Sequence, residues 1–142
     1  MAKRFVLDTS AIFAFTQNEE GSDSVADILS QATRGKVVVY LSFISVMEIY
    51  YVTWQVKGES LAKELIVLLN ALPLELVDSH PRLTLAAGRI KARHRLSVAD
   101  AFVGATAVEK QATLVHKDPE LAPLSAYVEL LNLPYKKSVS RS

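Results

Sequence analysis

The sequence contains no cysteine, only five prolines and five glycines among 142 residues, and no long apolar run. The absence of cysteine excludes disulfide bonds and thiolate metal sites, which favours a protein of the cytoplasm. The longest aliphatic run covers residues 65–69 and is far too short to cross a bilayer, so we expect no contact with a membrane. Lys3 and Arg4 resemble the start of an export signal, but Asp8 interrupts the apolar run that follows, so we expect no such signal.

Neither sign of charge dominates, because 16 Lys and Arg face 15 Asp and Glu and the formal net charge is +1. An anionic partner must therefore be held by a local cluster of cations and not by the field of the whole protein. Half of the residues are hydrophobic and 22% are charged, a composition that excludes a largely disordered chain. This length predicts one domain over residues 1–135, followed by a basic, flexible tail at 136–142.

Apolar runs of strand type alternate with segments of helical periodicity. The run from Val37 to Leu41 is rich in β-branched residues and is typical of a strand that is buried on both faces. Strands are predicted over 5–7, 36–41, 74–77, 113–115 and 127–131, and helices over 11–15, 22–34, 45–57, 59–72, 81–93 and 97–110. This alternation predicts an α/β fold, a three-layer α/β/α sandwich around a mostly parallel central sheet.

The first strand ends in a polar cluster. Three apolar residues at 5–7 lead directly into Asp8, Thr9 and Ser10. Asp8 therefore emerges at the carboxyl edge of the sheet, where open α/β folds bind ligands, and Thr9 or Ser10 can cap the helix that follows. The plain alternative is that Asp8 only helps to form a turn, since Asp is common there.

Three further acids are predicted at the same edge. Glu48 and Asp100 fall in the expected first turns of helices 45–57 and 97–110, and Asp118 follows the strand at 113–115. Helices run opposite to strands in a right-handed parallel sheet, so these acids converge on Asp8. Each acid also suits a helix cap or a turn. Together, with Lys117 as the one cation in these motifs, four carboxylates repel one another unless a metal ion separates them, and all-oxygen ligands indicate Mg²⁺ or Mn²⁺.

Four short segments carry a family resemblance in the right order along the whole chain. They are 6–11 (VLDTSA), 45–48 (SVME), 96–101 (LSVADA) and 113–120 (TLVHKDPE), and they resemble the four motifs of the PIN-domain family, closest to the VapC-type toxins. The resemblance implies a PIN-like fold and a metal-dependent endoribonuclease, usually a homodimer, that a small antitoxin protein holds inactive. One departure is His116, which stands where the family often has Thr or Ser.

By motif position, the resemblance assigns the acidic catalytic and metal-binding roles to four residues: Asp8, Glu48, Asp100 and Asp118. Asp8 and Asp100 are the expected direct ligands, and the other two complete the site directly or through water. Thr9, Ser10 and Glu120 are expected auxiliaries, because the two hydroxyls lie beside Asp8 and Glu120 occupies a position that is often acidic in relatives. A bound metal ion can generate hydroxide and stabilise the charge of a phosphodiester during hydrolysis. The sequence contains no nucleophile elbow and no zinc-type histidine spacing.

A basic stretch precedes Asp100. Residues 79–99 contain no acid, and we expect four of its cations to bind RNA: Arg89, Lys91, Arg93 and Arg95. The plain alternative is a solvated helix face. The signal carries no information about the RNA sequence.

The helix expected over 45–57 is apolar around almost its whole circumference. Met47, Tyr50, Tyr51 and Trp54 follow helical spacing, so they either fill the core or face a partner, and we favour a partner.

Three other functions share part of this pattern. A phosphotransferase of the haloacid dehalogenase type needs a second Asp where Ser10 stands, and a non-catalytic PIN adaptor would have lost acids that are all present here. A housekeeping PIN nuclease in RNA processing stays open beside the toxin.

Overall fold

The computed structural model describes residues 2–135, so the predicted tail at 136–142 lies outside the described part of the chain. Its central sheet has five strands in the order β3-β2-β1-β4-β5, and every neighbouring pair is parallel. The strands are β1 (Lys3–Leu7), β2 (Val37–Ser42), β3 (Glu75–Val77), β4 (Thr113–His116) and β5 (Leu130–Asn132). The predicted mostly parallel α/β sandwich is confirmed.

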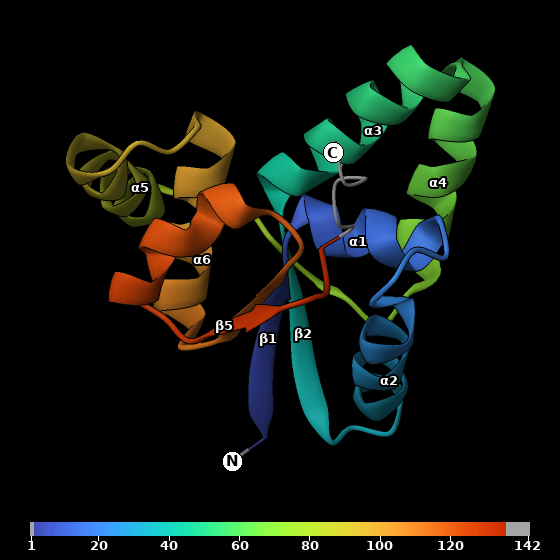
Figure 1. Cartoon of the computed structure of the whole chain (residues 1–142), viewed down its shortest axis with the longest axis horizontal. Helices are drawn as coiled ribbons and strands as arrows, with labels where there is room; N and C mark the ends of the chain where they lie inside the picture. Colours follow the sequence, from blue (N-terminus) through green and yellow to red (C-terminus); the bar gives the residue numbers. More distant parts are fainter. Residues whose placement is uncertain (1, 136–142) are drawn as a thin grey trace, which may run out of the picture.

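Helices cover both faces of this sheet. They are α1 (Thr9–Thr16), α2 (Ser22–Thr33), α3 (Phe43–Lys57), α4 (Glu59–Ala71), α5 (Pro81–Arg93), α6 (Val98–Lys110) and the 3-10 helix η1 (Pro119–Ala126). In Figure 1, α5 and α6 lie on one side of the strands and α1 to α4 on the other. Alternate residues of β1 divide between two hydrophobic clusters, with Phe5 and Leu7 in one and Val6 in the other, because successive strand side chains point to opposite faces.

Several predicted element ends differ from the structure. Asp8, and neither Thr9 nor Ser10, caps α1. Gly21 precedes α2 with a left-handed φ of 97°, which glycine adopts readily, and no side chain caps that helix. The last strand is shorter than the predicted 127–131 and begins only at Leu130, because η1, with two prolines, occupies residues 119–126 before it.

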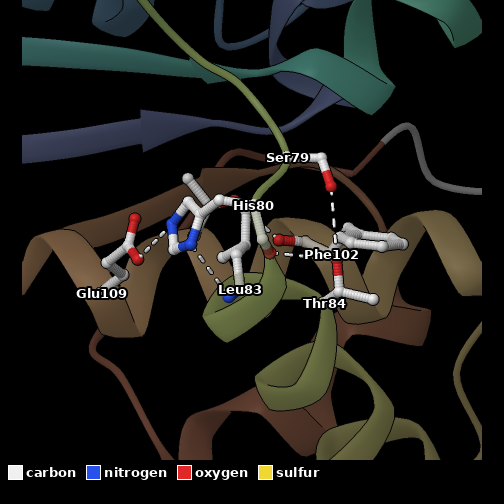
Figure 2. A network of polar contacts seen from close by, with 7 residues as sticks. Ser79, His80, Leu83, Thr84, Phe102 and Glu109 are labelled. Carbon is white, nitrogen blue, oxygen red and sulfur yellow. Dashed lines mark hydrogen bonds and ion pairs between the residues drawn. The ribbon is translucent and has the colours of Figure 1, made fainter.

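The start of α5 packs against α6 (Figure 2). The Nδ1 atom of His80 accepts a hydrogen bond from the backbone N–H of Leu83 at 3.3 Å, which caps α5. Its Nε2 atom donates to Oε1 of Glu109, near the end of α6, at 2.7 Å. Only residues 94–97 join the end of α5 to the start of α6 at Val98, so the two helices are neighbours.

Helix α3 turns its large apolar side chains outward. Its buried side chains are Ser45, Ile49 and Thr53, which lie four residues apart on one face of the helix. Tyr51 and Trp54 are 44% and 43% exposed. Met47 and Val56 are also exposed, and so are Leu61, Val67 and Leu68 on the neighbouring α4. The core-filling alternative is therefore wrong for Met47, Tyr51 and Trp54, which form a free apolar face in the described chain.

In residues 2–135, no helix has the length and apolar character that crossing a membrane requires.

Candidate metal centre

The strand order reverses direction between β1 and β4, and the acidic residues gather at the carboxyl ends of these two strands. The chain passes from β1 to β2 and β3 on one side, and then returns to β4 and β5 on the other. The backbone N–H of Asp8 donates to the carbonyl oxygen of Val115 at 3.0 Å, so Asp8 continues the ladder between β1 and β4. Such a switch point is where open α/β sheets bind ligands.

Asp8 is buried and held by Ser10. Its Oδ2 atom accepts hydrogen bonds from the backbone N–H of Ser10 at 3.1 Å and from Ser10 Oγ at 2.6 Å. Ser10 Oγ also accepts the backbone N–H of Lys117 at 2.8 Å, across 107 positions of sequence. Ser10 therefore orients Asp8 and ties it to the loop that follows β4.

Glu48 reaches the same edge from the second turn of α3, and not from the predicted first turn. Helix α3 begins at Phe43 because the Ser42 side chain accepts the N–H of Ile44, so Glu48 is the sixth residue of the helix. Ser45 is buried and does not cap the helix, which excludes the alternative that Ser45 and Glu48 form a capping box. Thr9 Oγ1 donates a 2.7 Å hydrogen bond to Oε1 of Glu48.

Asp100, Asp118 and Glu120 form the tightest group of carboxylates. Asp100 is the third residue of α6, and its N–H donates to the capping Ser97 Oγ at 3.1 Å, as the cap pattern predicts. Asp118 caps η1, and its Oδ1 atom accepts the N–H of Glu120 at 2.9 Å. One carboxylate oxygen from each of the three acids lies within 4.8 Å of the others, a spacing that could hold a metal ion.

Glu120, which the sequence predicts only as an auxiliary, joins this closest trio. Its sequence signal is the Asp-Pro-Glu order at 118–120, which starts a helical turn and brings the two acids to one end of it. Asp8 and Glu48 lie beside the trio and not within it. The charge of Asp8 is close enough to raise the pKa values of Glu48 and Asp100, so we treat the five acids as one cluster.

Burial and like charges raise the pKa values of three of these acids. Burial is the largest cause of the raised pKa of Asp8, followed among the raising causes by the charge of Asp118, whereas the Ser10 hydrogen bonds oppose it. Burial also raises the pKa of Glu48, and Asp8 and Asp118 add to it against the Thr9 bond. For Asp100, burial and then the charge of Asp8 raise the pKa to about 7. Ionising all of these groups is therefore unfavourable without a cation between them.

Within residues 2–135, no Lys, Arg or His forms an ion pair with Asp8, Glu48, Asp100 or Asp118. Lys117, the one cation of the motifs, turns away toward the loop between α1 and α2. An oxygen-only donor set with uncompensated charge fits a hard divalent cation such as Mg²⁺ or Mn²⁺.

His116 supports Asp118 through the backbone. The side chain of His116 is buried, and its Nδ1 atom accepts the N–H of Asp118 at 3.2 Å. Its Nε2 atom has no hydrogen-bond partner in the part of the chain that the structure covers. His116, which stands where PIN-type sequences often have a hydroxyl, therefore holds the turn that presents Asp118, while Ser10 holds the same loop from the other side.

Of the cations in the basic stretch at 79–99, Lys91 makes a hydrogen bond within the chain, and Arg82, Arg89, Arg93 and Arg95 are exposed. Arg82, Arg89 and Arg93 are exposed on α5, and their spacing of seven and four residues places them on one face. Lys91 donates from Nζ to the carbonyl oxygen of Leu96 at 3.0 Å, so it also holds the loop that leads to Asp100. Arg95 is exposed in that loop.

Solved structures of similar fold include VapBC complexes and a VapC toxin. VapBC2 from Rickettsia felis, bound to a DNA fragment of its promoter, has a TM-score of 0.74 at 18% identity, over 92% of this chain and 99% of that one. DNA-bound VapBC from Salmonella typhimurium has a TM-score of 0.72 at 18% identity, over 93% and 98%. VapC20 from Mycobacterium tuberculosis, a toxin that cleaves the sarcin–ricin loop, has a TM-score of 0.68 at 18% identity, over 88% and 97%.

These similarities establish the fold alone. Comparison with curated protein sequences finds no significant match. The family profile described as "PIN domain" matches residues 5–126, a span that includes all five acids of the cluster. The chain therefore belongs to the PIN-domain family.

Proposed function

We propose that this protein is a divalent-metal-dependent endoribonuclease and the toxin of a VapBC-type toxin–antitoxin pair. The observation that carries the proposal is the trio Asp100, Asp118 and Glu120, whose carboxylate oxygens lie within 4.8 Å of one another beside Asp8 and Glu48. Membership of the PIN-domain family and the toxin–antitoxin complexes among the structural neighbours support it. The proposed hydrolysis of RNA would take place in the cytoplasm.

All five acids of the cluster would contribute to binding the metal ion. Asp100, Asp118 and Glu120 are closest to one another, and Asp8 with Glu48 would complete the site directly or through water. When bound, Mg²⁺ or Mn²⁺ would supply an activated water and stabilise the charge on the phosphate and on the leaving oxygen. Ser10 and Thr9 keep Asp8 and Glu48 oriented through their hydroxyls, and His116 holds the Asp118 turn.

The test of this function is incubation of the purified protein with mixed cellular RNA, with and without Mn²⁺, followed by mapping of the cut ends. We expect internal cuts with Mn²⁺ and none in excess EDTA. Undiminished cleavage in EDTA would exclude the metal mechanism, and intact RNA under both conditions would exclude the nuclease.

A toxin and a housekeeping nuclease differ in their genetic context. A toxin gene is expected to lie beside an open reading frame for a small antitoxin, and its expression alone should arrest growth that the antitoxin restores. A housekeeping nuclease would show neither property. The structural neighbours that contain both toxin and antitoxin favour the first outcome.

We also propose that the basic side chains at the end of α5 and in the following loop grip RNA. Arg89, Lys91, Arg93 and Arg95 lie along the path that leads to Asp100, so they can contact phosphates near the acidic cluster. In a cleavage-deficient background, replacing Arg89 and Arg93 with Ala should weaken RNA binding. The log–log salt slope should fall by about 0.7 for each phosphate of a single strand that the variant no longer neutralises.

The matched control replaces Arg34 and Lys36, which are exposed between α2 and β2 at the opposite end of the sheet. Fluorescence anisotropy over a salt series measures both pairs. Equal losses of affinity for the two pairs would show that α5 contributes only general charge and makes no specific interaction with RNA.

The exposed apolar face of α3 is our proposed partner surface, for a second subunit of a homodimer or for the antitoxin. Tyr51 and Trp54 are large, rigid and exposed, and the same helix carries Glu48, so a partner bound there would sit beside the acidic cluster. Replacing both with Ala should weaken assembly about tenfold or more, since aromatic anchors dominate interfaces. The midpoint of thermal unfolding should move by only about 4 °C or less, because neither side chain is buried in the core.

Sedimentation velocity of the protein alone and with its antitoxin, together with thermal melts, measures both effects. Replacing Leu76 and Leu85 with Ala is the control, because both are large apolar side chains that are exposed outside α3, at 56% and 70%. A large loss of stability with unchanged assembly would show that Tyr51 and Trp54 stabilise the fold and do not bind a partner.

A further inference from the structure

A cavity of about 680 Å³ opens directly beside the acidic cluster. Two of its lining residues belong to the site itself. Ser10 donates from Oγ to Asp8 at 2.6 Å, and Pro119 follows Asp118 in the chain. Under the proposed function, a phosphate of an RNA strand sits at the carboxylates. The nucleoside next to that phosphate then lies within reach of the cavity.

Two aromatic rings line this cavity, which suits a flat ligand. Phe13 comes from α1 and is half-buried, and Tyr135 lies after β5 and is 39% exposed. These rings come from elements far apart in the sequence, and both line the same hollow. Aromatic side chains bind single-stranded nucleic acids by stacking on the faces of the bases.

Besides Ser10, the polar side chains of the lining are one ordered cation, Lys117, and two acids, Glu19 and Glu20. Lys117 is 10% exposed, and its Nζ atom contacts Oε1 of Glu19 at 3.4 Å and the backbone oxygen of Glu20 at 2.9 Å. These contacts fix the turn that carries both acids. The Glu20 carboxylate is exposed and makes no hydrogen bond with the side chains or backbone of residues 2–135. A carboxylate only accepts hydrogen bonds, so this side of the cavity favours a ligand that donates them.

We propose that this cavity is a nucleobase subsite that favours guanine next to the phosphate to be cleaved, an inference that rests on the proposed nuclease function. Guanine carries two adjacent donors, N1–H and the N2 amino group, which match the two oxygens of one carboxylate. Uracil places a single N–H between two carbonyl oxygens that a carboxylate repels. Adenine and cytosine offer one amino group beside an unprotonated ring nitrogen. Recognition of the Watson–Crick edge of an unpaired base, combined with stacking, is the usual way in which proteins read single-stranded RNA.

The first experiment measures binding without cleavage. The full-length wild-type protein in buffer that contains Mn²⁺ is titrated calorimetrically with the four nucleoside 5′-monophosphates, which contain no phosphodiester bond to cleave and differ only in the base. We expect GMP to bind about tenfold more tightly than UMP, the discrimination that one bidentate contact provides. Glu20→Gln should remove this preference, whereas Glu75→Gln, an exposed acid on β3, should not change it.

Stacking is tested separately with Tyr135. Tyr135→Ala should weaken binding of all four nucleotides about tenfold, and Tyr135→Phe should restore it because the ring is kept. Equal affinities for the four bases in the unsubstituted cavity, or no response to either change, would overturn the proposal.

The second experiment maps the cut ends in a randomised RNA library with the wild-type protein. Guanine should be enriched at one position beside the cut, and Glu20→Gln should lose the enrichment but keep cleavage. Cleavage without any base preference would overturn the subsite and leave the nuclease function standing. Absence of cleavage would overturn the nuclease function. The GMP titration would then test separately whether the cavity binds guanine.

Discussion

The Asp100→Asn variant is expected to lose RNA cleavage by about 10²-fold or more and to become more stable at the same time. The activity falls because the closest trio of carboxylates loses one of its three charges, and groups that hold charge at a reacting centre have effects of this size. The stability rises because burial, and then the charges of neighbouring acids, raise the pKa of Asp100 to about 7, so its ionised form destabilises the folded state.

Cleavage rates in the presence of Mn²⁺, and circular dichroism and thermal melts in metal-free buffer at about pH 8, measure these opposite effects. The matched control is Asp78→Asn, an exposed aspartate in the segment between β3 and α5. Asp8→Asn should behave like Asp100→Asn, because burial and the charge of Asp118 raise the pKa of Asp8 as well. Full activity in either variant would remove the acidic cluster from the mechanism.

The metal-free wild-type protein is expected to lose stability as the pH rises from about 4 to about 7, the reverse of the usual behaviour of an aspartate. The folded-state pKa of Asp100 is raised to about 7, above that of the unfolded chain. In this pH window the folded state therefore binds more protons than the unfolded state, so the free energy of unfolding falls with rising pH and levels off above the folded pKa. The shift corresponds to a loss of about 2–4 kcal/mol.

A divalent cation should reverse this loss. Mn²⁺ at about one hundred times its dissociation constant adds about 2.7 kcal/mol if it binds only the folded state, and it binds best when the carboxylates are ionised. Urea unfolding at fixed pH values, with and without Mn²⁺, measures the effect. Asp100→Asn should flatten the pH dependence but not abolish it, because the pKa values of Asp8 and Glu48 are raised too. A wild-type protein that gains stability between about pH 4 and about pH 7 would contradict the raised pKa of Asp100 in the folded state.

The exposed face of α3 shows where a sequence pattern is correct but incomplete. The ring of apolar residues correctly predicted a helix with a free apolar surface. The pattern could not decide which residues point inward, and the structure buries Ser45, Ile49 and Thr53 while Tyr51 and Trp54 remain exposed. That choice depends on how α3 docks against α1 and α4, and no local spacing encodes it.

The sequence by itself determined the features that local chemistry controls. The apolar run before Asp8 specified β1, and the pair Ser97 and Asp100 specified the start of α6, because a strand and a helix cap depend on neighbours within a few residues. The parallel sandwich followed from the alternation of such elements. That Asp8, Glu48, Asp100 and Asp118 meet at one edge also followed, since parallel topology brings strand ends together.

Only the tertiary structure decided how close the acids come and which of them meet. Glu120 entered the trio with Asp100 and Asp118 because η1 turns back at the end of β4, and Glu48 arrived from a second turn because Ser42 starts α3 earlier than the pattern indicated. Strand register, helix docking and the Ser10 bridge to Lys117 depend on contacts between residues far apart in the sequence, and the bridge spans 107 positions. Burial and mutual charge, which raise the pKa of Asp100 to about 7, exist only after these contacts have formed.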